Sequence, residues 1–525
     1  MATSPINTSS LHSLDLSEFP CLDDKQVGAL RHIENLANQP ENDWSHMMGR
    51  AAMQEDHGAY RYQLAFMAIA LALAHRHRLP AAPAVFKDTF DRLINKMVHP
   101  EVWLYWRRSS QGKGPLSMSA PKLPQETDPV NRDNIMYSAY VQVMTLLYHT
   151  LFGDEKYARP NAIEFKFSPT LCLNDEHAVF HYNEKTLNEH IYWKMVEAGY
   201  LGVACEPYCV FQVCNQVPIL GFRLHDWLYG GDIAAEVTAG YKEAWNEFGG
   251  MLSEDGHFYT VVYTPERNVL TSKGAPWADS WCGMLMNSWN SEFVRANYIR
   301  QRDDWLLAGP DDTFSLKLPP PIPGYEMPDG AAGDFGWAVG FASEMGDKET
   351  LQGLLAHADR FMAPRWKDGG YFYPRQDRSR DENGNLTYMD PTMGNAMLAY
   401  GRLNVPDGLK KLYEEPWQAG HFQEPSIIHV SKNTNLVRAV FLPEHSALVF
   451  TFERRSGSIG DAQFSVGNID QSGRCWKLCQ DDIEVAQGTA NSSAFSGKVQ
   501  GSVTNGKLQM SCPQESRTTI VMTWR

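Results

Sequence analysis

Three cysteines and one glutamate lie within ten residues of one another. Cys205, Cys209 and Cys214 are spaced four and five residues apart, and Glu206 follows the first of them. Thiols donate protons and, once ionised, act as bases, while a desolvated carboxyl group beside a thiol can tune it or act as an acid. The spacings are poor for zinc and the segment has no histidine, so we expect no metal here. The segment predicts acid–base chemistry, with buried inert thiols as the alternative.

Other motifs that carry chemistry are missing from the sequence. It has no Walker loop, no GxSxG elbow, no HExxH pair and no dinucleotide fingerprint, so we expect no cofactor. The formal net charge of −15 disfavours nucleic acid and anionic membrane surfaces as partners.

The cellular location is predicted from the apolar runs and the cysteines. The longest apolar run, residues 64–74, is too short for a membrane span and predicts a buried helix. The N-terminus lacks the pattern of a signal peptide, and the nine cysteines are odd in number and scattered. We expect a cytoplasmic protein with reduced thiols.

Aromatic residues make up 12% of the 525 residues, with 15 Trp and 22 Tyr. Such a content fits either a large core or a deep apolar pocket lined by aromatic side chains. The length fits two domains.

Helical periodicity dominates from residue 26 to residue 417, after a loosely docked or flexible lead-in at residues 1–25. Glycine, proline, asparagine and aspartate clusters separate the helical segments. Repeated helix–loop–helix units predict a mainly α protein, an α/α-barrel built as a toroid of helical hairpins. The helical patterns cover residues 63–77, 134–153, 215–230, 234–252, 280–298, 336–362 and 393–404.

Strand-like segments interrupt the helices and then replace them. Residues 256–270 and 369–389 predict hairpins or long loops between helices. Residues 418–525 carry short strands at regular spacing, which predicts a smaller antiparallel β-sandwich-like domain. Within it, the pair Asn505-Gly506 predicts a tight hairpin turn.

Several stretches occur in the order in which they occur in one known family, the linalool dehydratase/isomerases. The resemblance covers roughly Trp103 to Arg402, with a weaker extension back to Tyr62. It implies an α/α-barrel with a central apolar cavity, and dehydration or isomerisation of a terpenoid allylic alcohol without a redox or metal cofactor. The matching stretches are Cys205-Glu206-Pro207, Cys214-Asn215, Asp128-Pro129, Asn134 to Tyr137, Leu64 to Phe66, Trp281 and Glu344 to Asp347.

The resemblance also implies catalytic residues. Cys205 and Cys214 are similar to the family's paired cysteines, and Glu206 accompanies them. Where the family has a histidine after the Asn134 segment, this chain has Tyr140, which can donate a hydrogen bond but is a poor base. Asp279, where the family is not acidic, could replace the lost acid–base group, with a helix N-cap as the alternative.

Large apolar side chains near these positions are candidates for binding the substrate, with ordinary core packing as the alternative. They are Tyr62, Met136, Phe211, Trp277 and Trp281.

The expected function is a cofactor-independent lyase or isomerase acting on a small hydrophobic terpenoid in specialised metabolism. A cyclase or pericyclase using the same pocket is the first alternative, since such catalysis needs shape and hydrogen-bond donors more than a proton relay. A carbohydrate-active hydrolase or lyase, with two carboxylates across an open cleft, is the second. A non-catalytic binding protein is the last. A homo-oligomer is compatible with the sequence.

Overall fold

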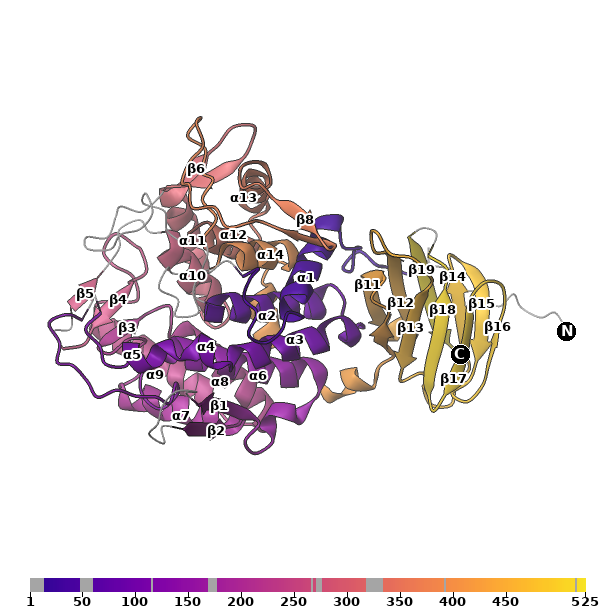
Figure 1. The fold of residues 1–525 in the computed structure, drawn as a ribbon, viewed down its shortest axis with the longest axis horizontal. Helices are drawn as coiled ribbons and strands as arrows, with labels where there is room; N and C mark the ends of the chain where they lie inside the picture. The colour runs from indigo at the N-terminus through magenta and orange to yellow at the C-terminus, as the bar shows by residue number, and fades with distance from the viewer. Residues whose placement is uncertain are drawn as a thin grey trace. The chain divides into compact units, whose positions relative to one another are not determined.

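The chain is mainly helical and ends in a region of β-strands, as the sequence predicts (Figure 1). The structure, a computed structural model, describes residues 14–47, 60–114, 117–168, 177–265, 268–270, 276–317, 334–390, 393–514 and 517–525. These residues form two compact units. The helical unit comprises residues 32–73 and 90–416, and the β unit comprises residues 1–31, 74–89 and 417–525.

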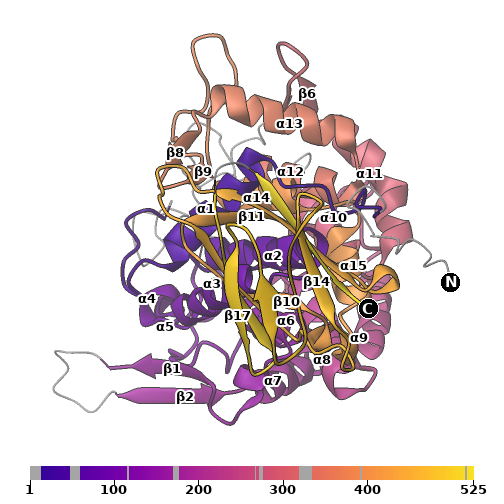
Figure 2. The same ribbon diagram turned by 90° about the vertical axis from the view of Figure 1, so that its right-hand side faces the viewer.

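Five helices of the helical unit pack in a consecutive series: α6 contacts α8, α8 contacts α10, α10 contacts α12, and α12 contacts α14. Both views place α2 between α6 and α8 on one side and α10, α12 and α14 on the other (Figures 1 and 2). In α6, almost every side chain is buried, as expected of a helix that is apolar on all sides. These helices are α2 (Tyr60–His77), α6 (Ile135–Phe152), α8 (Gln216–Tyr229), α10 (Pro276–Met286), α12 (Asp334–Met345) and α14 (Gly394–Leu403).

A second set of helices alternates with the first along the chain. Helix α7 packs on α6, α9 on α8, α11 on α10, and α13 on α12. Helix α13 buries one face, with Thr350, Leu354 and His357 among its buried residues, so it is amphipathic. The set comprises α7 (Glu184–Glu197), α9 (Ile233–Glu247), α11 (Ser291–Trp305), α13 (Lys348–Phe361) and α15 (Gly408–Glu414).

Two of the predicted helical segments each contain two helices. Residues 280–298 are divided between α10 and α11 by a turn at residues 287–290, and residues 336–362 between α12 and α13. The second break falls at Gly346, where φ is +70°, and Asp347 then caps α13 by accepting a hydrogen bond from the Thr350 N–H at 3.1 Å. Gly346, with its positive φ, therefore ends α12, and Asp347 is the N-cap residue of α13.

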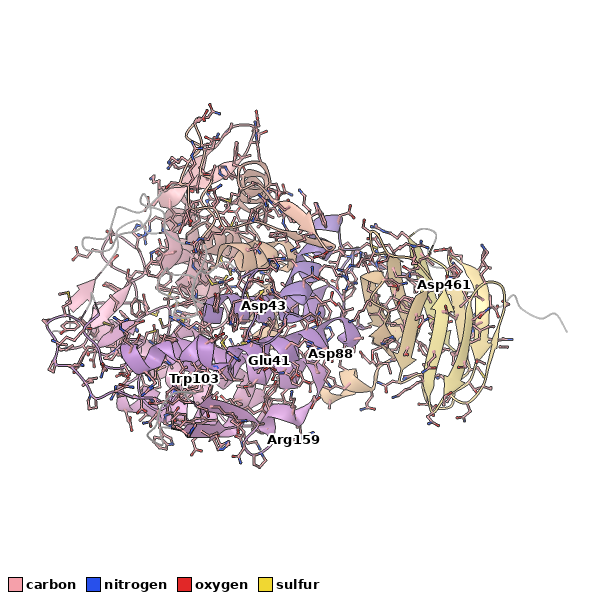
Figure 3. All side chains as sticks on the ribbon, in the orientation of Figure 1. Glu41, Asp43, Asp88, Trp103, Arg159 and Asp461 are labelled. Atoms are coloured by element: carbon pink, nitrogen blue, oxygen red, sulfur yellow. The ribbon has the colours of Figure 1, made fainter. Side chains whose placement is uncertain are left out.

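Shorter elements complete the helical unit. Trp103, labelled in Figure 3, is fully buried at the end of α4, and its Nε1 donates to the Val98 carbonyl at 3.1 Å. The described helices and strands of this set are α1 (Asp24–Ala37) and α3 (Pro83–Met97), which the unit boundary divides, α4 (Pro100–Trp103), α5 (Tyr105–Ser109), β1 (Ile163–Phe167), β2 (Ala178–Tyr182), β6 (Leu306–Ala308), β7 (Phe314–Leu316), β8 (Arg365–Lys367) and β9 (Gly370–Phe372).

The hairpin predicted at residues 256–270 is confirmed. Strand β4 (Val261–Tyr263) pairs antiparallel with β5 (Asn268–Leu270). Strand β3 (Cys209–Phe211) joins the other edge of β4, with Phe211 opposite Val261. This sheet carries the cysteine segment. The hairpin predicted at residues 369–389 has the bridges Gln376–Met389 and Arg380–Leu386.

The β unit holds two antiparallel sheets (Figures 1 and 2). The four-stranded sheet has the order β10-β13-β18-β17, and the six-stranded sheet has the order β11-β12-β19-β14-β15-β16. Phe452 of β12 and Phe464 of β13 pack across the two sheets with ring centroids 4.8 Å apart. The strands are β10 (Ser426–Val430), β11 (Thr434–Leu442), β12 (Ala447–Arg454), β13 (Ala462–Gly467), β14 (Trp476–Gln480), β15 (Ile483–Gly488), β16 (Ser493–Phe495), β17 (Gln500–Thr504), β18 (Lys507–Cys512) and β19 (Thr518–Trp524).

The predicted turn at Asn505-Gly506 is confirmed. Thr504 pairs with Lys507, and both intervening residues have positive φ, 50° and 69°. These angles are those of the type I′ turn that asparagine followed by glycine favours.

The N-terminal segment is more closely docked than the sequence suggests. Residues 1–13 lie outside the described part of the chain, but Leu14 packs with Val440 and Val521 of the β unit. The Leu22 N–H also donates to the Val437 carbonyl at 2.8 Å. Scattered apolar residues in a polar segment gave no periodicity from which this docking could be predicted.

Candidate active site

Aromatic side chains from four helices meet in the helical unit. Tyr62 and Phe66 lie one turn apart on α2, so they share a face of that helix. The Tyr140 ring, from α6, lies 5.8 Å from each of them, and the Trp281 ring, from α10, lies 5.7 Å from Tyr62. Trp337 of α12 stacks on Trp281 at 4.1 Å. We call these five residues the aromatic cluster.

Three members of the aromatic cluster, Tyr62, Tyr140 and Trp281, are candidates from the sequence. The other two, Phe66 and Trp337, were not among the predicted site residues. Phe66 lies four residues after Tyr62 in a helical pattern, and this spacing could have identified it. No sequence pattern marks Trp337, because its contact with Trp281 depends on α12 packing against α10 in the folded chain.

Two polar groups of the aromatic cluster are buried without a partner. The hydroxyl of Tyr140 and the Nε1 of Trp281 have no hydrogen-bond partner among the described residues. Burial raises the pKa of Tyr140 well above its ordinary value, and Tyr62 and Cys214 raise it further. Tyr140 is therefore a neutral donor near pH 7 and not a base.

A buried arginine borders the aromatic cluster at the first turn of α2. The Arg61 guanidinium lies over the rings of Tyr62 and Tyr105, 4.6 and 4.2 Å from their centroids. Burial alone would lower the pKa of Arg61, but the surrounding tyrosine, thiol and carboxyl groups raise it, so it stays charged. The Tyr105 hydroxyl in turn donates to Asn134 Oδ1 at 2.7 Å.

The cysteine segment is shaped by a tight turn. The Cys209 N–H donates to the Glu206 carbonyl and the Cys205 N–H donates to the Cys209 carbonyl, both at 2.9 Å. Tyr208, within the turn, has φ of 71°. The turn places Cys205 and Glu206 on one arm and starts β3 at Cys209.

Asn215 fixes the second cysteine against the first arm. Its Oδ1 accepts from the Val203 N–H at 2.8 Å, and its Nδ2 donates to the carbonyls of Val203 and Phe211 at 3.0 and 2.9 Å. Because Asn215 follows Cys214 directly, these bonds hold Cys214 beside the segment that carries Cys205.

The Cys205 thiol perturbs the pKa of both Cys214 and Glu206. Burial raises the pKa of Cys214 well above its ordinary value, a hydrogen bond with Cys205 raises it further, and Arg61 lowers it. Burial also raises the pKa of Glu206, against the lowering effects of Arg61 and of a hydrogen bond from Cys205. The order of groups is therefore Cys214, Cys205, Glu206. We call them the thiol–carboxyl chain.

The third cysteine of the segment is not part of this chain. Cys209 is buried, and burial raises its pKa to about 12, with smaller contributions from Glu206 and Cys205. It is a matched control for the other two.

Asp279 lies on α10 and is held by the loop before β4. Its Oδ2 is 2.6 Å from His257 Nδ1, and its Oδ1 accepts from the Phe258 N–H at 2.9 Å. His257 Nε2 lies 3.2 Å from Asp304 Oδ2, at the surface. Burial raises the pKa of Asp279 although the bond with His257 lowers it, while the bond with Asp279 raises the pKa of His257. These contacts give Asp279 a structural task, and its catalytic role stays a prediction.

The remaining predicted residues lie around the same elements. Met136 is buried one turn before Tyr140 on α6. Trp277 is partly buried, with its ring 6.4 Å from that of Trp281. Phe211 is partly buried in β3.

Glu344, from another matching stretch, is fully buried. It accepts four hydrogen bonds of 2.9–3.0 Å, from the side chains of Asn287 and Asn404 and the N–H groups of Leu409 and Lys410. It therefore ties α12 to the start of α15.

Two further properties concern the described residues only. No group of three or more His, Cys, Asp or Glu side chains among them is arranged to hold a metal ion. None of the helices within the described ranges is long and apolar enough to cross a membrane.

The chain belongs to the linalool dehydratase/isomerase family. The model of that family, described as linalool dehydratase/isomerase, matches residues 61–379, which is more than half of the chain. The match includes the aromatic cluster and the thiol–carboxyl chain. The resemblance found in the sequence is confirmed.

Solved structures with a distant likeness to this chain include two carbohydrate-active enzymes. One is the GH76A alpha-1,6-mannanase from Salegentibacter sp. HEL1_6, with 8% identity, a TM-score of 0.41, and coverage of 72% of this chain and 98% of that one. Another is the unsaturated glucuronyl hydrolase from Bacillus sp. GL1, with 11% identity, a TM-score of 0.40, and coverage of 74% and 95%. These likenesses are too distant to bear on the reaction.

Proposed function

We propose that this protein is a cofactor-independent lyase or isomerase that dehydrates or isomerises a small terpenoid allylic alcohol. The observation that carries the proposal is the thiol–carboxyl chain, whose member Cys214 is buried and close enough to Tyr140 of the aromatic cluster to raise its pKa. Membership of the linalool dehydratase/isomerase family supports the reaction class.

The proposed chemistry needs one acid and one base. The Cys214 thiol protonates the substrate hydroxyl, and the carbon–oxygen bond then breaks. Water departs, and a cation-like allylic carbon skeleton remains. The thiolate that remains then takes a proton from the neighbouring carbon, which forms the new double bond and restores the thiol. Arg61, which lowers the pKa of Cys214, stabilises that transient thiolate, and Cys205 donates a hydrogen bond within the same chain.

The aromatic cluster supports the same reaction. Faces of tyrosine, phenylalanine and tryptophan rings attract positive charge, so they stabilise the cation-like intermediate. Phe66 is fully buried and Trp337 nearly so, and such walls exclude the water that would trap the intermediate.

A cyclase or pericyclase is the second candidate, and one observation favours it. Tyr140 stands where the family has a histidine, and its buried hydroxyl is a neutral hydrogen-bond donor. A rearrangement or cycloaddition needs such donors and shaped walls, but no base. The carbohydrate-active alternative stays a prediction and is an outcome of the experiment below.

We also propose the arrangement around this site. The alternation of two sets of helices supports an α/α-barrel that closes around the aromatic cluster. The described cysteines are free thiols, which supports a reducing, cytoplasmic location. A homo-oligomer stays a prediction.

The proposal is tested by turnover without added cofactor. Purified protein in reducing buffer with EDTA is incubated with terpenoid alcohols, polyenes and oligosaccharides, and the products are analysed by mass spectrometry. Loss or gain of one water from an alcohol, absent with Cys214→Ala, supports the lyase. Products of unchanged mass support an isomerase or cyclase, and cleavage of an oligosaccharide alone would overturn the proposal.

A further inference from the structure

Two hydrogen-bond donors of the aromatic cluster are buried and unsatisfied within the described structure. The Tyr140 side chain is fully buried and Trp281 is 7% exposed, and neither the hydroxyl nor the indole nitrogen has a partner there. Most buried polar groups in folded proteins are hydrogen-bonded, so two unpartnered donors beside the candidate catalytic groups call for an explanation.

Both donors belong to side chains that pack on the same two rings. Tyr140 and Trp281 each pack edge-on against Tyr62, with ring centroids 5.8 and 5.7 Å away, and each also contacts Phe66. The stack of Trp281 on Trp337, with an interplanar angle of 11°, fixes the plane in which the indole N–H lies. The two donors are held by rigid neighbours, as groups that await a ligand should be.

Neither donor can change its role near neutral pH. The indole nitrogen only donates, and the raised pKa of Tyr140 keeps its proton in place. The groups that perturb the pKa of Tyr140 include the Tyr62 hydroxyl, which accepts from Arg61, and two thiols, which are weak acceptors, and none of them pairs with Tyr140. A strong acceptor must therefore come from the ligand.

The kind of acceptor follows from counting donors and acceptors. A carbonyl oxygen has two lone pairs and no hydrogen, so it can satisfy two donors and leaves nothing unpaired. A hydroxyl group would satisfy the same donors but would bring a hydrogen of its own into an apolar surrounding. A hydrocarbon would leave both donors unsatisfied.

We propose that Tyr140 and Trp281 donate hydrogen bonds to a carbonyl group, of an aldehyde or ketone, that the terpenoid alcohol carries in addition to its reacting hydroxyl group. This inference rests on the proposed function, because it keeps the same site and the same apolar skeleton. It goes further in naming the group that orients the substrate. Hydrogen bonds to a conjugated carbonyl draw electron density from the attached double bonds, which suits isomerisation or cyclisation of that skeleton.

The test compares three ligands with the same carbon skeleton: geranial, geraniol and myrcene, an aldehyde, an alcohol and a hydrocarbon. Binding is measured by the change in tryptophan fluorescence. We expect geranial to bind about tenfold or more tighter than myrcene, because each net hydrogen bond contributes about 1 kcal/mol, or roughly fivefold. Infrared spectra of carbonyl-labelled geranial should show the C=O stretch at lower frequency in the complex than in an apolar solvent.

Two variants and one control make the test specific. Tyr140→Phe and Trp281→Phe should each lower the ratio of geranial affinity to myrcene affinity about fivefold. Tyr413, on α15, has another buried hydroxyl without a partner among the described residues. Tyr413→Phe should therefore leave the affinity for both ligands unchanged. Tyr140→Phe should also abolish part of the infrared shift.

Each outcome decides between the proposals. Equal binding of geranial and myrcene, or a preference that survives in both variants, would overturn the carbonyl site and leave the proposed function standing. Binding of none of the three ligands would overturn both. A preference for geraniol over geranial that Tyr140→Phe removes would replace the carbonyl with a hydroxyl group and would also overturn the inference.

Discussion

Removal of the Cys214 thiol is the sharpest test of the proposed chemistry. Cys214→Ala should lower kcat by roughly 10²–10⁴-fold, the contribution of a positioned acid or base, which corresponds to about 3–5 kcal/mol of transition-state stabilisation. No tyrosine takes over easily, because the pKa values of Tyr62 and Tyr140 are both raised well above their ordinary value by burial.

The structure supplies a matched control for this variant. Cys209 is 1% exposed and Cys214 is 2% exposed, so Cys209→Ala deletes the same atom from an equally buried place. Each deletion should cost about 1 kcal/mol of stability. Only Cys214, however, carries the hydrogen bond to Cys205.

The assay is single-substrate turnover followed by mass spectrometry, with melting temperature measured in parallel. If the thiols act as one unit, Cys205→Ala combined with Cys214→Ala should be no slower than Cys214→Ala alone. The reasoning fails if Cys209→Ala slows turnover as much as Cys214→Ala, or if Cys214→Ala stays within about fivefold of the native rate.

Three further predictions concern the supports of the site. Glu344→Gln places an amide N–H₂ group against two of the four donors that the carboxylate now satisfies. The free energy of unfolding, measured by denaturant titration, should therefore fall by about 2–6 kcal/mol. A fall below about 1 kcal/mol would contradict this role of Glu344. Because the bond with Asp279 raises the pKa of His257, the stability it provides is complete below pH ~6.5 and is lost as pH rises through the higher folded value. Melting temperatures should therefore fall above that pH in the native protein, and a His257→Gln variant with an equally steep fall would disprove the link. Gly283→Ala would bring a Cβ to 2.5 Å from a ring carbon of the fully buried Phe341, so it should cost about 1–3 kcal/mol by thermal denaturation, whereas an unchanged melting temperature would show that the ring can move.

Much of the fold can be predicted from local sequence patterns. The apolar run at residues 64–74 became the interior of α2, and the Asn505-Gly506 pair became the turn between β17 and β18. Breaks inside long helical patterns were harder, because the periodicity continues through the turn at residues 287–290. A hydrophobic period predicts a buried face and does not show where a helix stops.

Part of the candidate site can be predicted from the sequence. Composition, spacing and family resemblance predict Cys205, Glu206 and Cys214, and in the structure Cys205 perturbs the pKa of the other two groups. Asp279 was selected because of its unusual charge, and the structure shows His257 holding it. A lone aspartate in a sequence carries no sign of its partner, since that partner lies 22 residues away in a loop.

The sequence by itself determined the types of groups available: thiols, a carboxyl group and aromatic rings on apolar helices, in the order of the linalool dehydratase/isomerase family. Tertiary structure alone decided that the ring of Tyr62 packs against those of Tyr140 and Trp281, and that Trp337 stacks on Trp281. The physical reason is that periodicity assigns each helix a buried face, whereas the helix that packs against this face is chosen by the packing of the whole unit.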